Sequence, residues 1–294
     1  MTSVLQARLT SAASRVLPSR VKRRLKSLVR AYDQIFRAFT PADLRGALRE
    51  LGIVPGDVVM VHSAFDKFTG FQAGPVEVIR TLQAVVGTGG TLMMPTIPFL
   101  GSAVDYARGD PVFDARQTVS RMGLITEVFR RSPGVVRSMH PTHSVAAWGS
   151  RAAAIIAGHE RAETPCGRLT PYGRLLEYDG KLLLAGVPAN TMTFCYFVAE
   201  ELEPRLAVPV LTRETYPVRW TDRDGTVRVS NLRLFSGRLD HDLSPLVNEL
   251  RRRQQWRERR VGRLRLNVLR AREVYDAAVA LSDRGMFVRE RPVR

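Results

Sequence analysis

A rigid turn that presents histidine is the first candidate for chemistry in this sequence. His140 and His143 are two of only 5 histidines, and Pro141 lies between them. Proline fixes its own φ and disfavours helical geometry at the residue before it, so the two rings do not share a helix. The sequence predicts a turn that delivers a histidine and leads into an apolar strand near Ser144, a common setting for catalysis. Turn hydrogen bonds alone are the alternative role of these rings.

Two hydroxyl side chains follow strands that the sequence predicts to be neighbours. The apolar run 58–61 leads to Ser63, and the run 91–94 leads to Thr96. Four consecutive apolar residues are typical of a strand buried on both faces, as in a parallel sheet. Because an amphipathic helix over 75–86 separates the runs, we expect a right-handed βαβ unit. Both hydroxyls would then lie at the sheet edge where ligands bind.

The segment Ser120-Arg121-Met122-Gly123 is expected to begin a helix after a long loop over residues 97–119. The free backbone amides and the dipole of a helix N-terminus favour a bound anion. Gly123 has no side chain to obstruct such a ligand. Ser120 can also serve as an ordinary helix cap, and the two roles are compatible.

Three segments that differ in composition and expected secondary structure follow one another along the chain. Residues 1–39 form a basic arm whose apolar side chains recur at helical spacing, and residues 40–205 form an α/β core. Residues 206–294 contribute a β-hairpin around Asp222-Arg223-Asp224-Gly225, with helices packed on the same core. A basic amphipathic arm can pack on its own domain, on a second subunit of a homodimer, or on an anionic membrane surface.

Positive charge is abundant and is carried almost entirely by arginine. The formal net charge is +17, and lysine occurs only at positions 22, 26, 67 and 181. We interpret most of this charge as a solvated surface, with attraction of phosphates, nucleotides or acidic lipid as the alternative. No recognisable nucleic-acid-binding motif accompanies it, so we expect no nucleic-acid partner.

Hydropathy and cysteine usage indicate the compartment. No apolar run is long enough to cross a bilayer, and no secretory signal is evident, so a cytoplasmic protein is expected. Cys166 and Cys195 are the only cysteines and give neither a disulfide framework nor zinc spacing. We interpret both as small buried apolar residues and expect no bound metal.

Several motifs occur along the chain in a recognisable order. They are Val61-His62-Ser63, Gly74-Pro75, Gly90-Thr91-Leu92-Met93-Met94-Pro95-Thr96, Ser120-Arg121-Met122-Gly123, His140-Pro141-Thr142-His143-Ser144 and Leu182-Leu183-Leu184-Ala185-Gly186-Val187. Over roughly residues 40–280 this ordered set resembles the aminoglycoside 3-N-acetyltransferase (antibiotic N-acetyltransferase) family. The basic arm and the Asp-Arg-Asp-Gly hairpin make the chain more similar to members associated with bacterial surface-polysaccharide clusters than to resistance enzymes.

This resemblance implies a three-layer α/β/α fold with a largely parallel central sheet. It also implies an enzyme that transfers acetyl from acetyl-CoA to an amine by direct attack. By analogy with the family, Ser63, Thr96, Ser120, Met122 and Gly123 would lie along the path of CoA. Histidine is the usual base for taking the proton of the amine, because its pKa lies near 7.

The helix after the apolar strand 182–187 departs from the family pattern. Members typically carry His-x-x-Glu where this chain has Tyr196 and Ala199. Glu200 is one position out of register, which turns it about 100° away on a helix. Three accounts remain open. His143, with or without Glu200, takes the proton; Tyr196 serves only as a hydrogen-bond donor to an amine of low pKa; or transferase activity is lost and a binding role is kept.

The leading expectation is a cytoplasmic, metal-free, acetyl-CoA-dependent N-acetyltransferase that acts on an amino sugar. The positive charge of the chain favours an anionic, nucleotide-linked amino sugar over a polycationic aminoglycoside. An aminoglycoside antibiotic acetyltransferase is one alternative, and a non-catalytic scaffold that binds CoA or sugar is the other.

Overall fold

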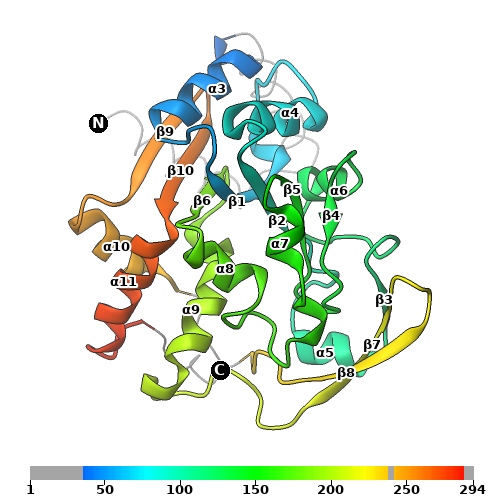
Figure 1. The fold of residues 1–294 in the computed structure, drawn as a ribbon. Helices are drawn as coiled ribbons and strands as arrows, with labels where there is room; N and C mark the ends of the chain where they lie inside the picture. Colours follow the sequence, from blue (N-terminus) through cyan, green and yellow to red (C-terminus); the bar gives the residue numbers. More distant parts are fainter. Residues whose placement is uncertain (1–35, 238–241, 288–294) are drawn as a thin grey trace, which may run out of the picture.

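A seven-stranded sheet forms the centre of the computed structural model, which describes residues 36–237 and 242–287 (Figure 1). Its strands lie in the order β4-β5-β2-β1-β6-β10-β9. Their bounds are β1 Val58–Ser63, β2 Thr91–Pro95, β4 Val136–Arg137, β5 Val145–Gly149, β6 Lys181–Ala185, β9 Arg257–Val261 and β10 Leu264–Arg270. Strand β2 is buried throughout, as expected for a strand with both faces covered.

The three central strands are parallel, and the strands outside them are antiparallel. β1 pairs in parallel with both β2 and β6. β5 and β4 continue the sheet beyond β2, and β10 and β9 continue it beyond β6, each by antiparallel pairing. The expected parallel arrangement therefore holds for the centre, while the whole sheet is mixed. Antiparallel neighbours need only short connections, and the histidine turn is itself the connection between β4 and β5.

Helices cover both faces of this sheet, which confirms the expected three-layer α/β/α arrangement. One face packs against α3 Pro41–Glu50, α4 Pro75–Val86 and α6 Leu124–Arg130. The other face packs against α7 Ala152–Ile156, α8 Pro171–Glu177, α9 Phe194–Leu202, α10 Ser244–Arg252 and α11 Ala271–Ser282. The alternating side chains of the central strands divide between the two cores, so Met60 belongs to one and Val59 to the other.

The first helix of the core shows how local sequence sets a helix start. Thr40 accepts a hydrogen bond from the backbone N–H of Asp43, and the Asp43 carboxylate accepts one from the backbone N–H of Thr40. This reciprocal cap satisfies two backbone donors that a helix end would otherwise leave unpaired. Pro41 occupies the first turn, where its missing N–H costs no hydrogen bond.

A second, three-stranded sheet stands apart from the central one (Figure 1). It contains β3 Val112–Asp114, β7 Tyr216–Thr221 and β8 Val227–Leu232, and the last two form the predicted hairpin. Helix α5 Ala103–Arg108 packs against this sheet. The expectation of a loop without structure over residues 97–119 was therefore wrong. Both α5 and β3 are short and depend on the distant hairpin for their packing, which local periodicity does not reveal.

The segment after residue 205 also contributes to the central sheet, because β10 pairs with β6 and β9 pairs with β10. The proposed division of the chain at that point remains a prediction. The basic arm is expected over residues 1–39 and lies almost wholly outside the described residues. Within the part of the chain that is described, no helix is both long and apolar enough to span a bilayer.

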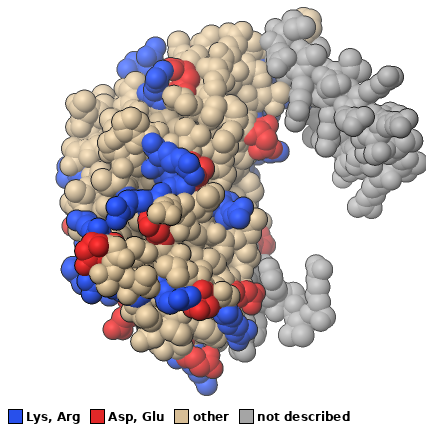
Figure 2. Space-filling model, turned by 90° about the vertical axis from the view of Figure 1, so that its right-hand side faces the viewer, with Lys and Arg blue, Asp and Glu red and all other residues tan. Residues whose placement is uncertain are grey.

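Arginine side chains are frequent over residues 251–265, and several of them have carboxylate partners. Arg257 binds Glu273 at 2.8 Å, and Arg259 binds Glu50 at 2.8 Å. Figure 2 shows the same mixture on one face of the molecule, where basic and acidic side chains are interspersed. Paired charges of this kind fit a solvated surface better than a dedicated site for a polyanion.

We predict that Gly149→Ala destabilises the fold strongly. Gly149 has a φ of +112°, and an added Cβ would lie 2.1 Å from the carbonyl oxygen of Gly90. The variant should lose at least about 2 kcal/mol of unfolding free energy, measured by urea denaturation. Gly46→Ala in α3 is the control, because nothing lies within 4 Å of its added Cβ. Alanine there should gain up to about 1 kcal/mol, and equal stability of both variants would contradict the prediction.

Candidate active site

Two adjoining cavities lie beyond the carboxyl ends of the central parallel strands. The larger cavity has a volume of about 620 Å³, and its lining includes His62, Ser63, Pro95, Arg121, Gly123 and Val187. The smaller cavity has a volume of about 290 Å³, and its lining includes Phe99, Ser102, His143, Asn190, Tyr196 and Phe235. Met122, Thr191 and Thr193 line both cavities, so the two meet there.

The segment that precedes α6 forms one wall of the larger cavity. The helix was expected to start at Ser120, but it starts at Leu124 and Gly123 is its cap, with a φ of 111°. An added Cβ on Gly123 would lie 3.7 Å from the carbonyl oxygen of Ser63, so this glycine lies at the end of β1. Ser63, Met122 and Gly123 thus line one cavity, although they come from two separate motifs.

Thr96 and Ser120 were expected on the same path, but the structure places both side chains behind the cavity wall. Thr96 is fully buried and Ser120 nearly so. The Ser120 hydroxyl accepts a hydrogen bond from the backbone N–H of Met122 at 3.2 Å. The Thr96 hydroxyl contacts Ser144 at 2.9 Å and accepts a hydrogen bond from Arg137 at 3.0 Å. Both hydroxyls form hydrogen bonds within the protein. They therefore support the cavity wall and do not face the cavity.

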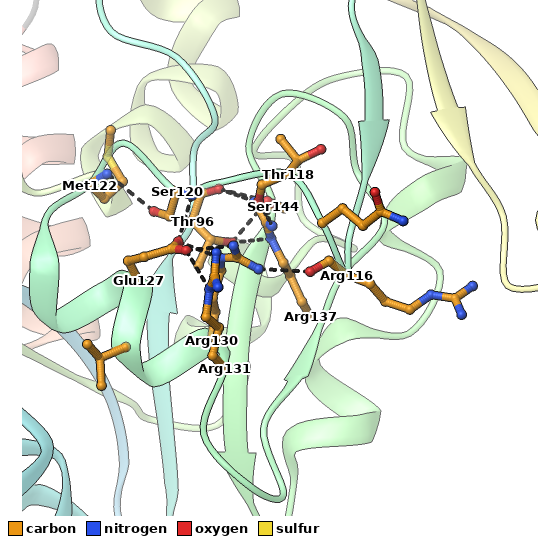
Figure 3. A network of polar contacts seen from close by, with 12 residues as sticks. Thr96, Arg116, Thr118, Ser120, Met122, Glu127, Arg130, Arg131, Arg137 and Ser144 are labelled. Atoms are coloured by element: carbon orange, nitrogen blue, oxygen red, sulfur yellow. Dashed lines mark hydrogen bonds and ion pairs between the residues drawn. The ribbon is translucent and has the colours of Figure 1, made fainter.

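Arg137, on β4, is the centre of a partly buried polar network that joins β4 to the residues after β2 and before β5 (Figure 3). Its guanidinium donates to the carbonyl oxygen of Thr96 at 2.6 Å and to that of Thr118 at 2.5 Å. It also lies over the ring of Phe113, 4.8 Å from the centroid. Burial lowers the pKa of Arg137 to about 9. The network fixes the start of β5, next to the histidine turn.

Glu127 anchors the loop before α6 (Figure 3). Its carboxylate accepts a hydrogen bond from the backbone N–H of Ser120 at 2.9 Å. It also accepts two from the Arg130 guanidinium, at 2.5 and 2.6 Å. Partial burial acts to raise the pKa of Glu127, but the hydrogen bonds from Arg130, Ser120 and Arg131 outweigh it and lower the pKa. The chain Arg130–Glu127–Ser120–Met122 thereby holds the wall that both cavities share.

His143 lies in an aromatic cage at the smaller cavity. Its ring centroid is 5.8 Å from Phe99, 6.0 Å from Tyr196 and 5.5 Å from Phe235, each in an edge-to-face arrangement. Its Nδ1 contacts the Thr142 hydroxyl at 3.0 Å. Burial lowers the pKa of His143 to about 3, so the ring is neutral at pH 7. The neutral imidazole can accept a hydrogen bond from a group in this cavity, and its lowered pKa makes it a weaker base than a solvated histidine.

Tyr196 and Ala199 occupy the two positions where the family pattern departs. Tyr196 lines the smaller cavity and stacks against Phe235 at 4.5 Å between centroids. Burial raises the pKa of Tyr196 to about 12, so its hydroxyl keeps its proton and can donate a hydrogen bond. Ala199 is buried in the hydrophobic core and offers no carboxylate.

Glu200 was proposed as a partner of His143, but the structure does not bring the two together. The Glu200 carboxylate accepts hydrogen bonds from the Thr164 hydroxyl and from the backbone N–H of Cys166. It is absent from the lining of both cavities. The one-residue offset from Ala199 turns it to another face of α9, as helical geometry requires. Burial raises the pKa of Glu200 to about 7 despite these two hydrogen bonds.

His140 forms turn hydrogen bonds, which was the structural alternative to a catalytic role. Its Nδ1 accepts a hydrogen bond from the backbone N–H of His143 at 3.2 Å and so closes the turn. Its ring stacks on His159 at 4.5 Å between centroids. It is fully buried and lines neither cavity. The two histidines of the turn therefore divide the work, since His140 builds the turn and His143 faces the cavity.

His62 is a site residue to which the sequence analysis gave no role. It precedes Ser63 at the end of β1 and lines the larger cavity. Its Nε2 lies 2.9 Å from the Thr193 hydroxyl and 3.1 Å from the backbone N of Thr193. Burial lowers the pKa of His62 to about 4. The sequence could have identified His62 by its position at the end of a predicted strand, which is the feature that identified Ser63.

The charges of the two cavities differ. Among the described residues, the lining of the larger cavity includes Asp66 and Arg121, whereas the lining of the smaller cavity includes no Asp, Glu, Lys or Arg. Within the described part of the chain, no three His, Cys, Asp or Glu side chains come close enough to hold a metal ion. The expectation of a metal-free site remains a prediction.

The buried histidines predict a specific dependence of stability on pH. His62, His140, His143 and His159 all have lowered pKa values caused first by burial. The unfolded chain takes up protons near pH 6.5 and the folded chain does not, so stability must fall as pH drops below about 6.5. Glu200, whose pKa is raised to about 7, acts in the opposite sense but is one group against four.

We expect the unfolding free energy to fall by at least about 1.4 kcal/mol between pH 6.5 and 5.5, measured by urea denaturation. His143→Gln should make this slope shallower, because one of the groups that the unfolded chain protonates is removed. A stability that is flat across this interval would contradict the burial of neutral histidines.

Comparison with known proteins agrees with this architecture. Residues 60–282 match the family model described as aminoglycoside 3-N-acetyltransferase. Aminoglycoside N(3)-acetyltransferase IV from Salmonella sp is 38% identical over 152 residues, which are 51% of this chain and 55% of that protein. The match thus spans little more than half the length of this relative.

Solved structures show the same fold over more of the chain. Aminoglycoside acetyltransferase AAC(3)-Xa superposes with a TM-score of 0.75 at 26% identity, covering 90% of this chain and 99% of that one. A variant of aminoglycoside acetyltransferase AAC(3)-IVa in complex with apramycin superposes with a TM-score of 0.66 at 28% identity, covering 84% and 93%. The chain therefore belongs to the aminoglycoside 3-N-acetyltransferase family.

Proposed function

We propose that this protein is an acetyl-CoA-dependent N-acetyltransferase that acetylates an amine of an amino sugar. The observation that carries the proposal is the meeting of two cavities at Met122, Thr191 and Thr193. One cavity suits a long anionic donor and the other a compact acceptor that carries an amine. Membership of the acetyltransferase family supports the reaction, and the curated relatives are named for aminoglycosides.

The larger cavity is the proposed site of acetyl-CoA. Its volume of about 620 Å³ is in the range typical of small-molecule sites. Arg121 lines it and offers a positive charge to the phosphates of CoA. The thioester would then lie near Met122 and Thr193, where the smaller cavity begins.

The smaller cavity is the proposed site of the acceptor. Its aromatic side chains, Phe99, Tyr196 and Phe235, present flat faces to the C–H groups of a sugar ring. A protonated amine gains no carboxylate partner from the described lining, so it would enter a desolvating environment. That environment favours the neutral amine, which is the nucleophilic form.

The proposed reaction is a direct transfer. The amine nitrogen attacks the carbonyl carbon of the thioester, a C–N bond forms, and the π electrons of the C=O bond move to oxygen. When the carbonyl re-forms, the C–S bond breaks and CoA leaves as the thiolate. His143 accepts the proton that the amine loses and passes it on to the departing sulfur, so acetyl-CoA and the amine give the amide and CoA thiol. Tyr196 donates a hydrogen bond at the acceptor and keeps its proton.

Release of free thiol from acetyl-CoA tests this function. The panel should contain amino sugars, nucleotide-linked amino sugars and aminoglycosides, with acetyl-CoA alone as the blank. We expect turnover of amino sugars. Turnover of aminoglycosides alone would overturn the acceptor assignment and leave the transferase intact.

A scaffold that binds CoA without catalysis is the second candidate, and the Tyr196 and Ala199 positions favour it because the usual base and carboxylate are absent there. Calorimetry with CoA separates the two functions. CoA binding without turnover of any amine in the panel would support the scaffold. The greater similarity to members associated with polysaccharide clusters remains a prediction. The same panel of amines tests it, because it compares nucleotide-linked amino sugars with aminoglycosides.

We predict that His143→Ala lowers kcat about 100-fold or more, because the amine loses its proton acceptor. Tyr196→Phe should lower kcat by about 10-fold, the effect of one hydrogen bond. Calorimetry should show unchanged CoA binding by both variants, since the two residues line the smaller cavity. Wild-type kcat in His143→Ala would remove this residue from the mechanism.

We also predict that Glu127→Gln raises the KM for acetyl-CoA about 5-fold with little change in kcat. The charge that holds Arg130 and the backbone of Ser120 is lost, so the wall of the larger cavity loosens. Glu77→Gln is the matched control, because among the described residues the Glu77 carboxylate pairs only with Arg80, on the surface at 3.5 Å. Equal kinetics in the two variants would show that the network does not position the donor.

A further inference from the structure

His62 lies close to the point where the two cavities meet. It is 8% exposed and lines the larger cavity at the end of β1. Its ring contacts Thr193, a residue that lines both cavities. The imidazole is thus one hydrogen bond away from the junction and lines the larger cavity, whereas His143 lines the smaller one.

The hydrogen bonds of this ring define its tautomer. The backbone N–H of Thr193 points at Nε2 from 3.1 Å, and a backbone amide can only donate. Nε2 must therefore be the acceptor and carry no proton. Burial lowers the pKa of His62 to about 4, so the ring is neutral at pH 7 and its single proton lies on Nδ1.

The Nδ1–H group has no acceptor among the described residues. The hydroxyl of the adjacent Ser63 is also buried and has no partner there. Unpaired polar atoms are uncommon inside proteins, and two on consecutive residues at a cavity point to a ligand that completes them. The missing partner of an N–H donor is an oxygen with a lone pair.

We propose that Nδ1–H of His62 donates a hydrogen bond to the carbonyl oxygen of the acyl thioester and stabilises the negative charge that develops there. This inference rests on the proposed acetyltransferase function. The proton stays on His62 throughout: as the C–N bond forms the oxygen gains the π electrons, and as the C–S bond breaks it returns them. The thioester would lie between His62 on the donor side and His143 on the acceptor side. Such a preorganised donor acts most strongly on charge that appears only in the transition state.

Two substitutions separate this role from a purely structural one. The amide nitrogen of asparagine falls near the position of Nδ1, and the amide of glutamine reaches the position of Nε2. His62→Asn therefore keeps a donor towards the thioester and loses the contact with Thr193. His62→Gln keeps the contact with Thr193 and loses the donor.

We expect His62→Gln to lower kcat by about 100-fold or more, with the KM for acetyl-CoA changed less than about 3-fold. His62→Asn should stay within about 10-fold of wild-type kcat. A His62→Gln variant that is as active as His62→Asn, or more so, would overturn the proposal. Absence of turnover in the wild-type protein would overturn the proposed function instead.

Nitrogen-15 NMR of the wild-type protein tests the same bond without relying on turnover or on variants that fold. The His62 resonances, assigned by their loss in His62→Asn, should show the proton on Nδ1. Acetonyl-CoA, a ketone analogue that keeps the carbonyl oxygen, should shift the Nδ1 resonance, whereas CoA should not. A proton on Nε2, or equal effects of the two ligands, would contradict the inference.

Discussion

Parallel pairing of β1 with both β2 and β6 is the constraint on which the site depends. Parallel strands end at the same edge, so the residues that follow them are brought together whatever their distance in sequence. The pairing aligns Ser63 with Ala185 and so brings the end of β1 beside the end of β6. The loop before α6 and the segment before α9 close over this edge, and the two cavities lie beneath them.

Exclusion of water determines the chemistry that this edge can support. His62 and His143 are both neutral because burial disfavours the imidazolium form. One can then act as a fixed hydrogen-bond donor and the other as a proton acceptor. Among the described residues the smaller cavity has no charged side chain in its lining, and Glu127 and Arg137, which support the walls, are held by several hydrogen bonds each. A site without loose charges near it preserves the strength of each directed hydrogen bond.

Local patterns in the sequence predicted most of the strands and helices that support the site. The apolar runs and the hairpin turn each depend on neighbours in the chain, and each was confirmed. The lining residues Ser63 and Gly123 were also identified, because strand ends and glycine at a helix start have recognisable chemistry, whereas Met122 was named through the family resemblance. These features depend on residues close together in the sequence, so the sequence alone is enough to predict them.

What the sequence could not provide depends on long-range partners. Thr96 looked like a cavity residue until Arg137, far along the chain, was seen to occupy its hydroxyl. Glu200 looked like a partner for His143 until its carboxylate was seen to bind the segment at Thr164. The antiparallel direction of the outer strands was not predicted for the same reason, since β10 joins the central strands by pairing with β6, a distant part of the chain. Hydrogen bonds between distant residues cannot be predicted from the spacing of apolar residues along the sequence.

The strand order has a consequence for how the chain acquires its structure during synthesis. β6 lies between β1 and β10 in the sheet, and β10 is synthesised well after β6. Until β10 has left the ribosome, one edge of β6 has no hydrogen-bonding partner from the central sheet. An open apolar edge is a template for association with other chains. Slow translation between β6 and β10 would prolong that exposure and with it the risk of association with other chains.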